Sequence, residues 1–217
     1  MSSTALGIVL GTAVGLRHAF EPDHLTAVST LVNETHTPWT GARLGVLWGL
    51  GHTISLVVVG TILALVGATL PPRAAIGFEL GVALMLLVLG ARAIAIAMRI
   101  EAHAVRDDAE PTHRHVHGGR SRWRPLVVGL VHGLAGSGAL SALVFAQMPG
   151  TGARVLYMTL FGLGSVVGMA IASGVAGTAI QHLVRSPRAR RRLGVATGVL
   201  SIVVGLAWGI PLLVSSG

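Results

Sequence analysis

Long stretches without a charged residue are the feature that most constrains what this chain can fold into. Such windows run over residues 44–70, 80–91, 125–151, 155–180 and 193–217. The longer ones reach the roughly 20 apolar residues that a helix needs to cross a bilayer. A soluble domain of 217 residues could not bury so much uninterrupted apolar sequence. The chain is therefore expected to be an all-α integral membrane protein.

The apolar pattern predicts six transmembrane helices, over residues 4–31, 40–67, 74–98, 124–147, 152–181 and 193–214. One long linker, 99–123, is rich in charge and histidine, so the chain divides into 1–98, 99–123 and 124–217. The first apolar run follows no basic residue and has no A-x-A-like cleavage site. It is expected to be a span and not a cleaved signal peptide.

Arginine indicates the orientation, because the chain has no lysine. Most arginines of the loops lie on one side of the predicted membrane, and the loops of the other side carry only Arg73 and Arg154. The main group follows the first, third and fifth spans and comprises Arg43, Arg99, Arg106, Arg114, Arg120, Arg122, Arg124, Arg185, Arg188, Arg190, Arg191 and Arg192. The positive-inside rule places this group in the cytoplasm and both termini outside. The run 188–192 is read as a topology anchor or an anionic-lipid contact, and not as a nucleic-acid site.

The two halves of the chain resemble each other. Segments 15–20 and 129–134, 47–52 and 160–165, and 80–83 and 193–196 match in order, at offsets of 114, 113 and 113 residues. Each half contributes three spans, so the halves enter the membrane in opposite directions. Two inverted three-helix repeats are typical of secondary transporters, whose binding sites lie at the repeat interface near the midplane.

The segment 17–24, with the sequence R-H-A-F-E-P-D-H, gathers ionisable residues at the end of the first apolar run. Such side chains are costly at membrane depth and usually mark an ion pathway. Histidine and carboxylate suit a borderline divalent cation such as Ni²⁺, Co²⁺ or Zn²⁺. The absence of cysteine disfavours pathways for Cu⁺, Hg²⁺ and Cd²⁺ and excludes disulfides.

Pro22 is expected to break the first helix, because it cannot donate to the carbonyl of His18 four residues earlier. In a straight helix His18 and Asp23 would diverge by about 140°. A break can turn His18, Asp23 and His24 towards one point and free the His18 carbonyl as a further ligand. In the second half, glycines in 133–138 could loosen the matching place. The alternative is a buried His18–Asp23 pair that stabilises the kink.

Other ionisable and polar residues are candidates for the pathway. His52, between glycines, is either a ligand or an interhelical hydrogen-bond partner. His132 is the repeat counterpart of His18 and could be a ligand, a gate or a packing residue. Arg17 is expected to balance Glu21 or Asp23, or to act as an outer filter. The pathway candidates are therefore His132, Glu21, Arg17 and Ser137.

The linker carries further histidines, at His103, His113, His115 and His117. Histidines at alternate positions can chelate a divalent cation when they are neutral. Lying outside the spans, they are expected to bind metal weakly and reversibly as an accessory site, with affinity falling below a pH of about 6.5. A passive, solvated linker is the alternative.

The histidine and aspartate motifs of this chain resemble those of a known family. His18, followed after four residues by Asp23-His24, matches the H-x-x-x-x-D-H motif of the nickel/cobalt transporter (NiCoT) family. Residues 50–53 resemble the L-G-H-[ST/D] motif of its next helix, and the chain is most similar to the short branch of urease-accessory nickel permeases. The resemblance implies a metal site at His18, Asp23, His24 and His52. Longer members have eight spans and an F-D-T-A-T-E motif, where this chain has G-S-V-V-G-M at 164–169.

The resemblance implies a permease for Ni²⁺ or Co²⁺ in the cytoplasmic membrane, with the metal as transported substrate and no catalytic cofactor; the donor chemistry alone does not exclude Zn²⁺. Its expected partners are the bilayer, the metal ion and a cytoplasmic metallochaperone. Uptake is expected, and efflux by the same fold is the alternative. No G-x-x-x-x-G-K-[ST] loop occurs, so ATP hydrolysis is not expected.

Two other classes remain as rivals. An intramembrane serine protease would use Ser137 as nucleophile and His132 or His52 as base. However, Ala135 stands where its G-x-S-G motif requires glycine, and no H-E-x-x-H zinc-protease motif occurs. The second rival is a metal sensor or chaperone without transport. No catalytic residue is expected.

Overall fold

The computed structural model describes residues 3–32, 37–107, 123–148, 150–184 and 186–215. Within these residues the secondary structure is entirely helical. The helices are α1 (Ser3–His18), α2 (Pro22–Val32), α3 (Pro38–Val66), α4 (Pro72–Asp107), α5 (Arg124–Gln147), α6 (Thr151–Leu183) and α7 (Pro187–Ser215).

Proline begins four of these helices, at Pro22, Pro38, Pro72 and Pro187. The first residues of a helix have no intrahelical acceptor for their N–H groups, so proline loses nothing there. The predicted break at Pro22 is present: α1 ends at His18, and α2 starts at the proline in a new direction. The first expected span, 4–31, is therefore two short helices.

Four described helices are long and apolar enough to cross a membrane: Pro38–Val66, Pro72–Arg99, Thr151–His182 and Pro187–Val214. Arg124–Ala135 is a shorter apolar helix within α5. The linker expected to begin at 99 is helical as far as Asp107, because residues 99–107 contain no glycine or proline. The chain is thus a multi-pass helical membrane protein.

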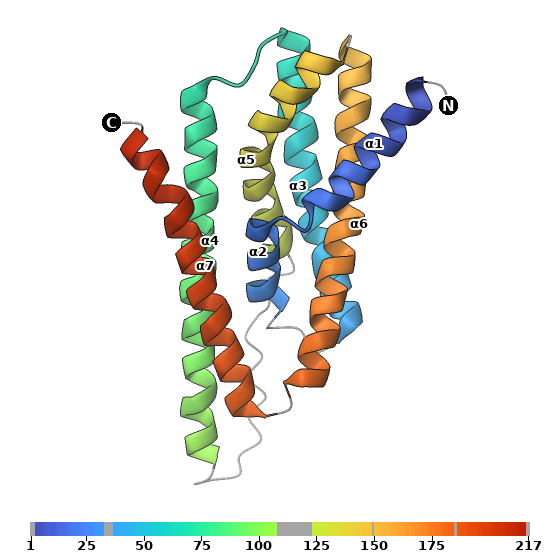
Figure 1. The fold of residues 1–217 in the computed structure, drawn as a ribbon. Helices are drawn as coiled ribbons and strands as arrows, with labels where there is room; N and C mark the ends of the chain where they lie inside the picture. Colours follow the sequence, from blue (N-terminus) through green and yellow to red (C-terminus); the bar gives the residue numbers. More distant parts are fainter. Residues whose placement is uncertain (1–2, 33–36, 108–122, 149, 185, 216–217) are drawn as a thin grey trace.

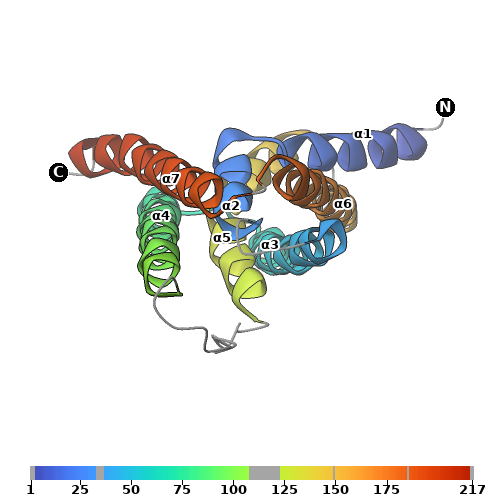
Figure 2. The ribbon, with the colours of Figure 1, turned by 90° about the horizontal axis from the view of Figure 1, so that it is seen from below.

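The helices form two groups around a central pair (Figure 1). Viewed from below, α4 and α7 lie side by side, α1, α3 and α6 form the other group, and α2 and α5 lie between them (Figure 2). The start of α1 and the end of α7 lie at the upper end of Figure 1, and α4 and α6 finish at the lower end. Apolar residues of α2, including Val28 and Leu31, pack with Trp48 and Leu86 in the main core cluster.

Glycines allow the helices of the two halves to approach closely. At each of four glycines, an added Cβ would overlap a backbone atom of the partner helix. The pairs are Gly15 with Phe161, Gly129 with Trp48, Gly51 with Leu126 and Gly164 with Thr12. The first two pairs are counterparts under the sequence repeat, and so are the last two. Contacts between α1 and α6 therefore mirror those between α5 and α3.

Gly129→Ala is expected to destabilise the protein by about 1–3 kcal/mol, as overpacking of a tight core does. The new methyl group would overlap the carbonyl oxygen of Trp48, which lies on α3. Gly77→Ala is the matched control, because a Cβ there meets nothing within 4 Å. Thermal unfolding of the purified protein in detergent measures both. Equal melting temperatures for the two variants would contradict the close approach of α3 and α5.

Candidate metal centre

Five ionisable residues converge where α1 gives way to α2. His18 is the last residue of α1, and Asp23 and His24 lie in the first turn of α2. His52 lies in the middle of α3, and His132 lies on α5. His24, His52 and His132 are buried, with exposed fractions of 1%, 0% and 2%. The break before Pro22 thus brings side chains of one apolar run to the same place as residues of two other helices.

His18, His24 and His52 form the first group. One ring nitrogen of each lies within 4.8 Å of the others. The ring centroids of His18 and His24 are 4.4 Å apart, and those of His24 and His52 are 5.4 Å apart. His18 Nε2, His24 Nε2 and both nitrogens of His52 are buried and have no hydrogen-bond partner. Buried polar atoms are normally paired, so this group has the donor atoms of a site for a further ligand.

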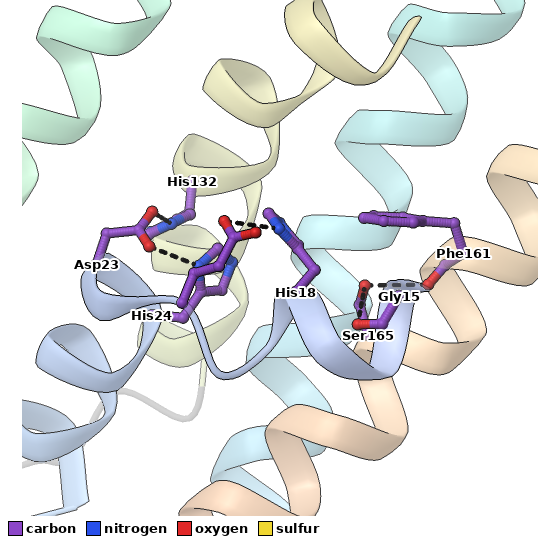
Figure 3. A network of polar contacts seen from close by, with 8 residues as sticks. Gly15, His18, Asp23, His24, His132, Phe161 and Ser165 are labelled. Carbon is purple, nitrogen blue, oxygen red and sulfur yellow. Dashed lines mark hydrogen bonds and ion pairs between the residues drawn. The ribbon is translucent and has the colours of Figure 1, made fainter. Parts of the chain in front are cut away.

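Asp23, His24 and His132 form a second group, whose ligand atoms also lie within 4.8 Å of one another. Asp23 lies beside the two rings and contacts both of them (Figure 3). Its Oδ1 accepts a hydrogen bond from His24 Nδ1 at 3.1 Å, and its Oδ2 accepts one from His132 Nε2 at 2.9 Å. The two groups share His24. The single coordination sphere of His18, Asp23, His24 and His52 that the sequence suggests stays a prediction.

Glu21 pairs with His18 at the more accessible edge of the cluster. His18 Nδ1 lies 2.9 Å from Glu21 Oε2, and the two side chains are 16% and 52% exposed. The carbonyl of His18 accepts a hydrogen bond from the backbone N–H of Glu21 at 3.0 Å, which uses one of its two lone pairs. Arg17 is exposed and, within the described residues, forms no ion pair with Glu21 or Asp23. Its expected role as their counter-charge is therefore not seen.

Aromatic rings and tight helix contacts fix the cluster. Trp48 lies 5.5 Å from His24 and 5.8 Å from His132, measured between ring centroids. A Cβ at Gly133 would overlap the backbone of His52, so α5 and α3 touch beside the site. Ser55 Oγ donates to the carbonyl of Leu130 at 2.7 Å across the same contact. These contacts set the distance between His52 and His132.

Ser165, the repeat counterpart of His52, makes a structural contact. Its hydroxyl is buried, 3.1 Å from the carbonyl oxygen of Gly15 and 3.0 Å from that of Phe161 (Figure 3). The hydroxyl therefore links α6 to α1 beneath His18. The second half thus provides a packing residue where the first half provides an imidazole.

The structure does not describe the side chains of the remaining predicted residues. Ser137 is on α5 and His103 is on α4, but their side chains are not among those described. His113, His115 and His117 lie outside the described residues. The accessory site and the protease rival thus stay untested predictions.

The donor set indicates the class of ion that would fit. Three imidazoles are nitrogen donors, which suit Ni²⁺, Co²⁺, Zn²⁺ and Cu²⁺, whereas Mg²⁺ and Ca²⁺ prefer oxygen.

The sequence repeat pairs His132 with His18, and this is the one sequence signal that indicates a position for His132 near the site. Nothing in the sequence indicated that His132 would bond to Asp23.

Comparisons with known proteins place the chain among membrane proteins. The family model described as cytochrome c biogenesis protein transmembrane region matches residues 25–207. Urease accessory protein UreH of Bacillus sp. (strain TB-90) is 30% identical over 212 residues, covering 97% of this chain and 93% of the relative. Chloroplast protein FOR GROWTH AND FERTILITY 2 of Arabidopsis thaliana is 26% identical over 202 residues, covering 91% of this chain and 54% of that protein. No solved structure gives a significant match.

Proposed function

The chain belongs to the cytochrome c biogenesis transmembrane-region family and is a homologue of the urease accessory protein UreH, and from this premise we propose that it is a permease for Ni²⁺ or Co²⁺. It is a secondary transporter of the cytoplasmic membrane, works in the direction of uptake and has no enzymatic activity. The metal is its substrate, and a cytoplasmic metallochaperone is the proposed recipient.

The observation that carries this proposal is the group of three histidines within the helix bundle. His18, His24 and His52 each present a buried nitrogen that has no hydrogen-bond partner. A structural histidine would be expected to use such atoms in interhelical hydrogen bonds. A divalent cation would satisfy several of them at once.

The name of the Bacillus relative supports nickel as the cargo. That protein is called a urease accessory protein, and the His18–His24 motif resembles nickel permeases associated with urease. The family match begins at residue 25, after His18, Asp23 and His24. The residues that would bind the ion are thus partly separate from the region that defines the family.

The family description also raises a role in cytochrome c biogenesis. Haem is attached to c-type cytochromes at a C-x-x-C-H motif, and thiol carriers exchange electrons through their own cysteine pairs. The 217 residues contain no cysteine. Thiol electron transfer by these residues is therefore excluded, and metal transport accounts better for the histidines.

Two inverted repeats are the proposed architecture of the transporter. The reciprocal glycine contacts support this arrangement, since the α1–α6 pairs recur as α5–α3 pairs. Together α1 and α2 would act as one interrupted span, as in transporters whose broken helices form the binding site. The arginine distribution supports a topology with both termini outside.

The membrane potential could drive uptake without ATP. One charge gains about 2.3 kcal/mol per 100 mV, so a divalent cation gains roughly 4.6 kcal/mol. That free energy supports roughly a thousandfold gradient, at about 1.4 kcal/mol for each factor of ten. Efflux would instead require a counter-ion such as H⁺.

Uptake of radiolabelled Ni²⁺, Co²⁺ and Zn²⁺ by cells expressing the chain tests the proposal. We expect saturable accumulation of Ni²⁺ or Co²⁺ above control cells, with Zn²⁺ at most a weak competitor. Faster loss of preloaded metal would instead identify an exporter. Cleavage of casein by the purified protein, without metal flux, would identify a protease and overturn the assignment.

A further inference from the structure

Asp23 does not belong to the group of three histidines. The two groups with metal-binding geometry among the described residues share His24, but Asp23 occurs only in the group with His132. Each oxygen of its carboxylate accepts a hydrogen bond, Oδ1 from His24 Nδ1 at 3.1 Å and Oδ2 from His132 Nε2 at 2.9 Å. The side chain is 16% exposed, so these bonds lie largely out of water.

The hydrogen bond to Asp23 determines which nitrogen of His24 can bind a metal. A carboxylate accepts, so the proton of the neutral His24 ring lies on Nδ1. The lone pair is then on Nε2, which is buried and has no partner. Metal-binding histidines commonly donate their other ring N–H to a carboxylate, which fixes the tautomer and raises the basicity of the ligand.

His18 shows the same arrangement. Its Nδ1 lies 2.9 Å from Glu21 Oε2, and its Nε2 is buried without a partner. Each of the two histidines near the break therefore has its own carboxylate on Nδ1. Both have Nε2 available, and His52 adds two further unpartnered nitrogens. His132 Nδ1 is also buried without a partner, but His132 lies in the group with Asp23 and not in the group of three histidines.

We infer that Asp23 is a positioning residue and not a metal ligand, an inference that rests on the proposed transport function. The ion is bound by His18, His24 and His52. Asp23 orients His24 towards the ion and, through His132, ties α2 to α5. The site is thus built from helices of the first half and steadied by one residue of the second half.

The link to α5 gives His132 a defined task. It is 2% exposed, and its ring centroid lies 4.1 Å from that of His24. Its bond to Asp23 joins residues 109 positions apart in the chain. A movement of the second half of the chain relative to the first would displace Asp23 through its bond to His132 and so rotate the His24 ring. Binding of the ion would therefore depend on how the two halves are positioned.

The visible absorption bands of bound Co²⁺ test the inference, because they report the atoms that coordinate the ion. Purified wild type, Asp23→Asn and His52→Ala are titrated with Co²⁺, with Glu79→Gln as the carboxylate control on α4. We expect Asp23→Asn to keep the wild-type bands while its affinity falls by about 10–100-fold, the usual cost of losing an orienting partner. His52→Ala should shift the bands, and Glu79→Gln should change neither property. Bands that shift in Asp23→Asn would make Asp23 a ligand and overturn the inference.

His132 variants decide the matter if Asp23→Asn does not fold. His132→Gln keeps an N–H that can donate to Asp23, whereas His132→Leu does not. Both should keep the wild-type bands, and only His132→Leu should lose affinity. Bands that change in both variants would instead place His132 among the ligands.

Wild-type transport, measured on the same preparation in liposomes, separates this inference from the proposed function. Wild type that neither binds Co²⁺ nor transports metal would end both. Wild type that transports metal while Asp23→Asn alters the bands would end the positioning role alone.

Discussion

Replacing His24 with alanine is expected to abolish saturable Ni²⁺ transport. Among the described residues, His24 is the one shared by both histidine groups, and it is only 1% exposed. Alanine removes a nitrogen donor and also the hydrogen-bond partner of Asp23 Oδ1. The loss should exceed the about 10–100-fold effect of an outer partner. The measurement is the initial rate of uptake, normalised to the amount of protein in the membrane.

His182→Ala is the matched control for this variant. His182 is an exposed histidine at the end of α6 and has no part in the cluster. It should transport as the wild type does. Normal transport by His24→Ala, with the protein correctly inserted, would contradict the assignment of the site.

His52→Ala is expected to have the next largest effect. His52 is fully buried, and neither ring nitrogen has a hydrogen-bond partner, so no structural bond is lost with it. Its removal leaves two imidazoles for the ion. The apparent affinity for Ni²⁺ should fall by more than the about 10–100-fold expected of an outer partner. The concentration dependence of uptake, at equal protein levels, measures this change.

Ser55→Ala separates the ligand role of His52 from its packing on α5. Ser55 lies one turn further along α3 and bonds to the carbonyl of Leu130 across the same helix contact. It should keep wild-type affinity with a modest loss of stability. Equal losses of affinity in Ser55→Ala and His52→Ala would show that the contact matters and not the imidazole.

Much of the fold could be predicted from the sequence, because membrane helices are long apolar runs with recognisable ends. Proline at position 22 predicted the break, and that break exists. The third expected span, 74–98, agrees with the apolar segment Pro72–Arg99, but the helix itself continues to Asp107, because residues 99–107 favour helix.

The convergence of His18, Asp23, His24 and His52 was expected, but the hydrogen bond between Asp23 and His132 was not. Which way Asp23 points depends on the rotation of α2 and on how near α5 lies. That distance is set by contacts such as those at Gly129 and Gly133, which involve residues far apart in the chain. Local sequence spacing carries no information about either quantity.

Reconstitution tests the central claim most directly, namely that the histidine cluster serves the passage of a divalent metal ion. The purified protein is placed in liposomes, an inside-negative potential is imposed, and the entry of radiolabelled Ni²⁺ is followed. The account predicts saturable entry that increases with the potential and far exceeds that of protein-free liposomes. Entry equal to that of protein-free liposomes, for protein shown to be folded, would contradict it.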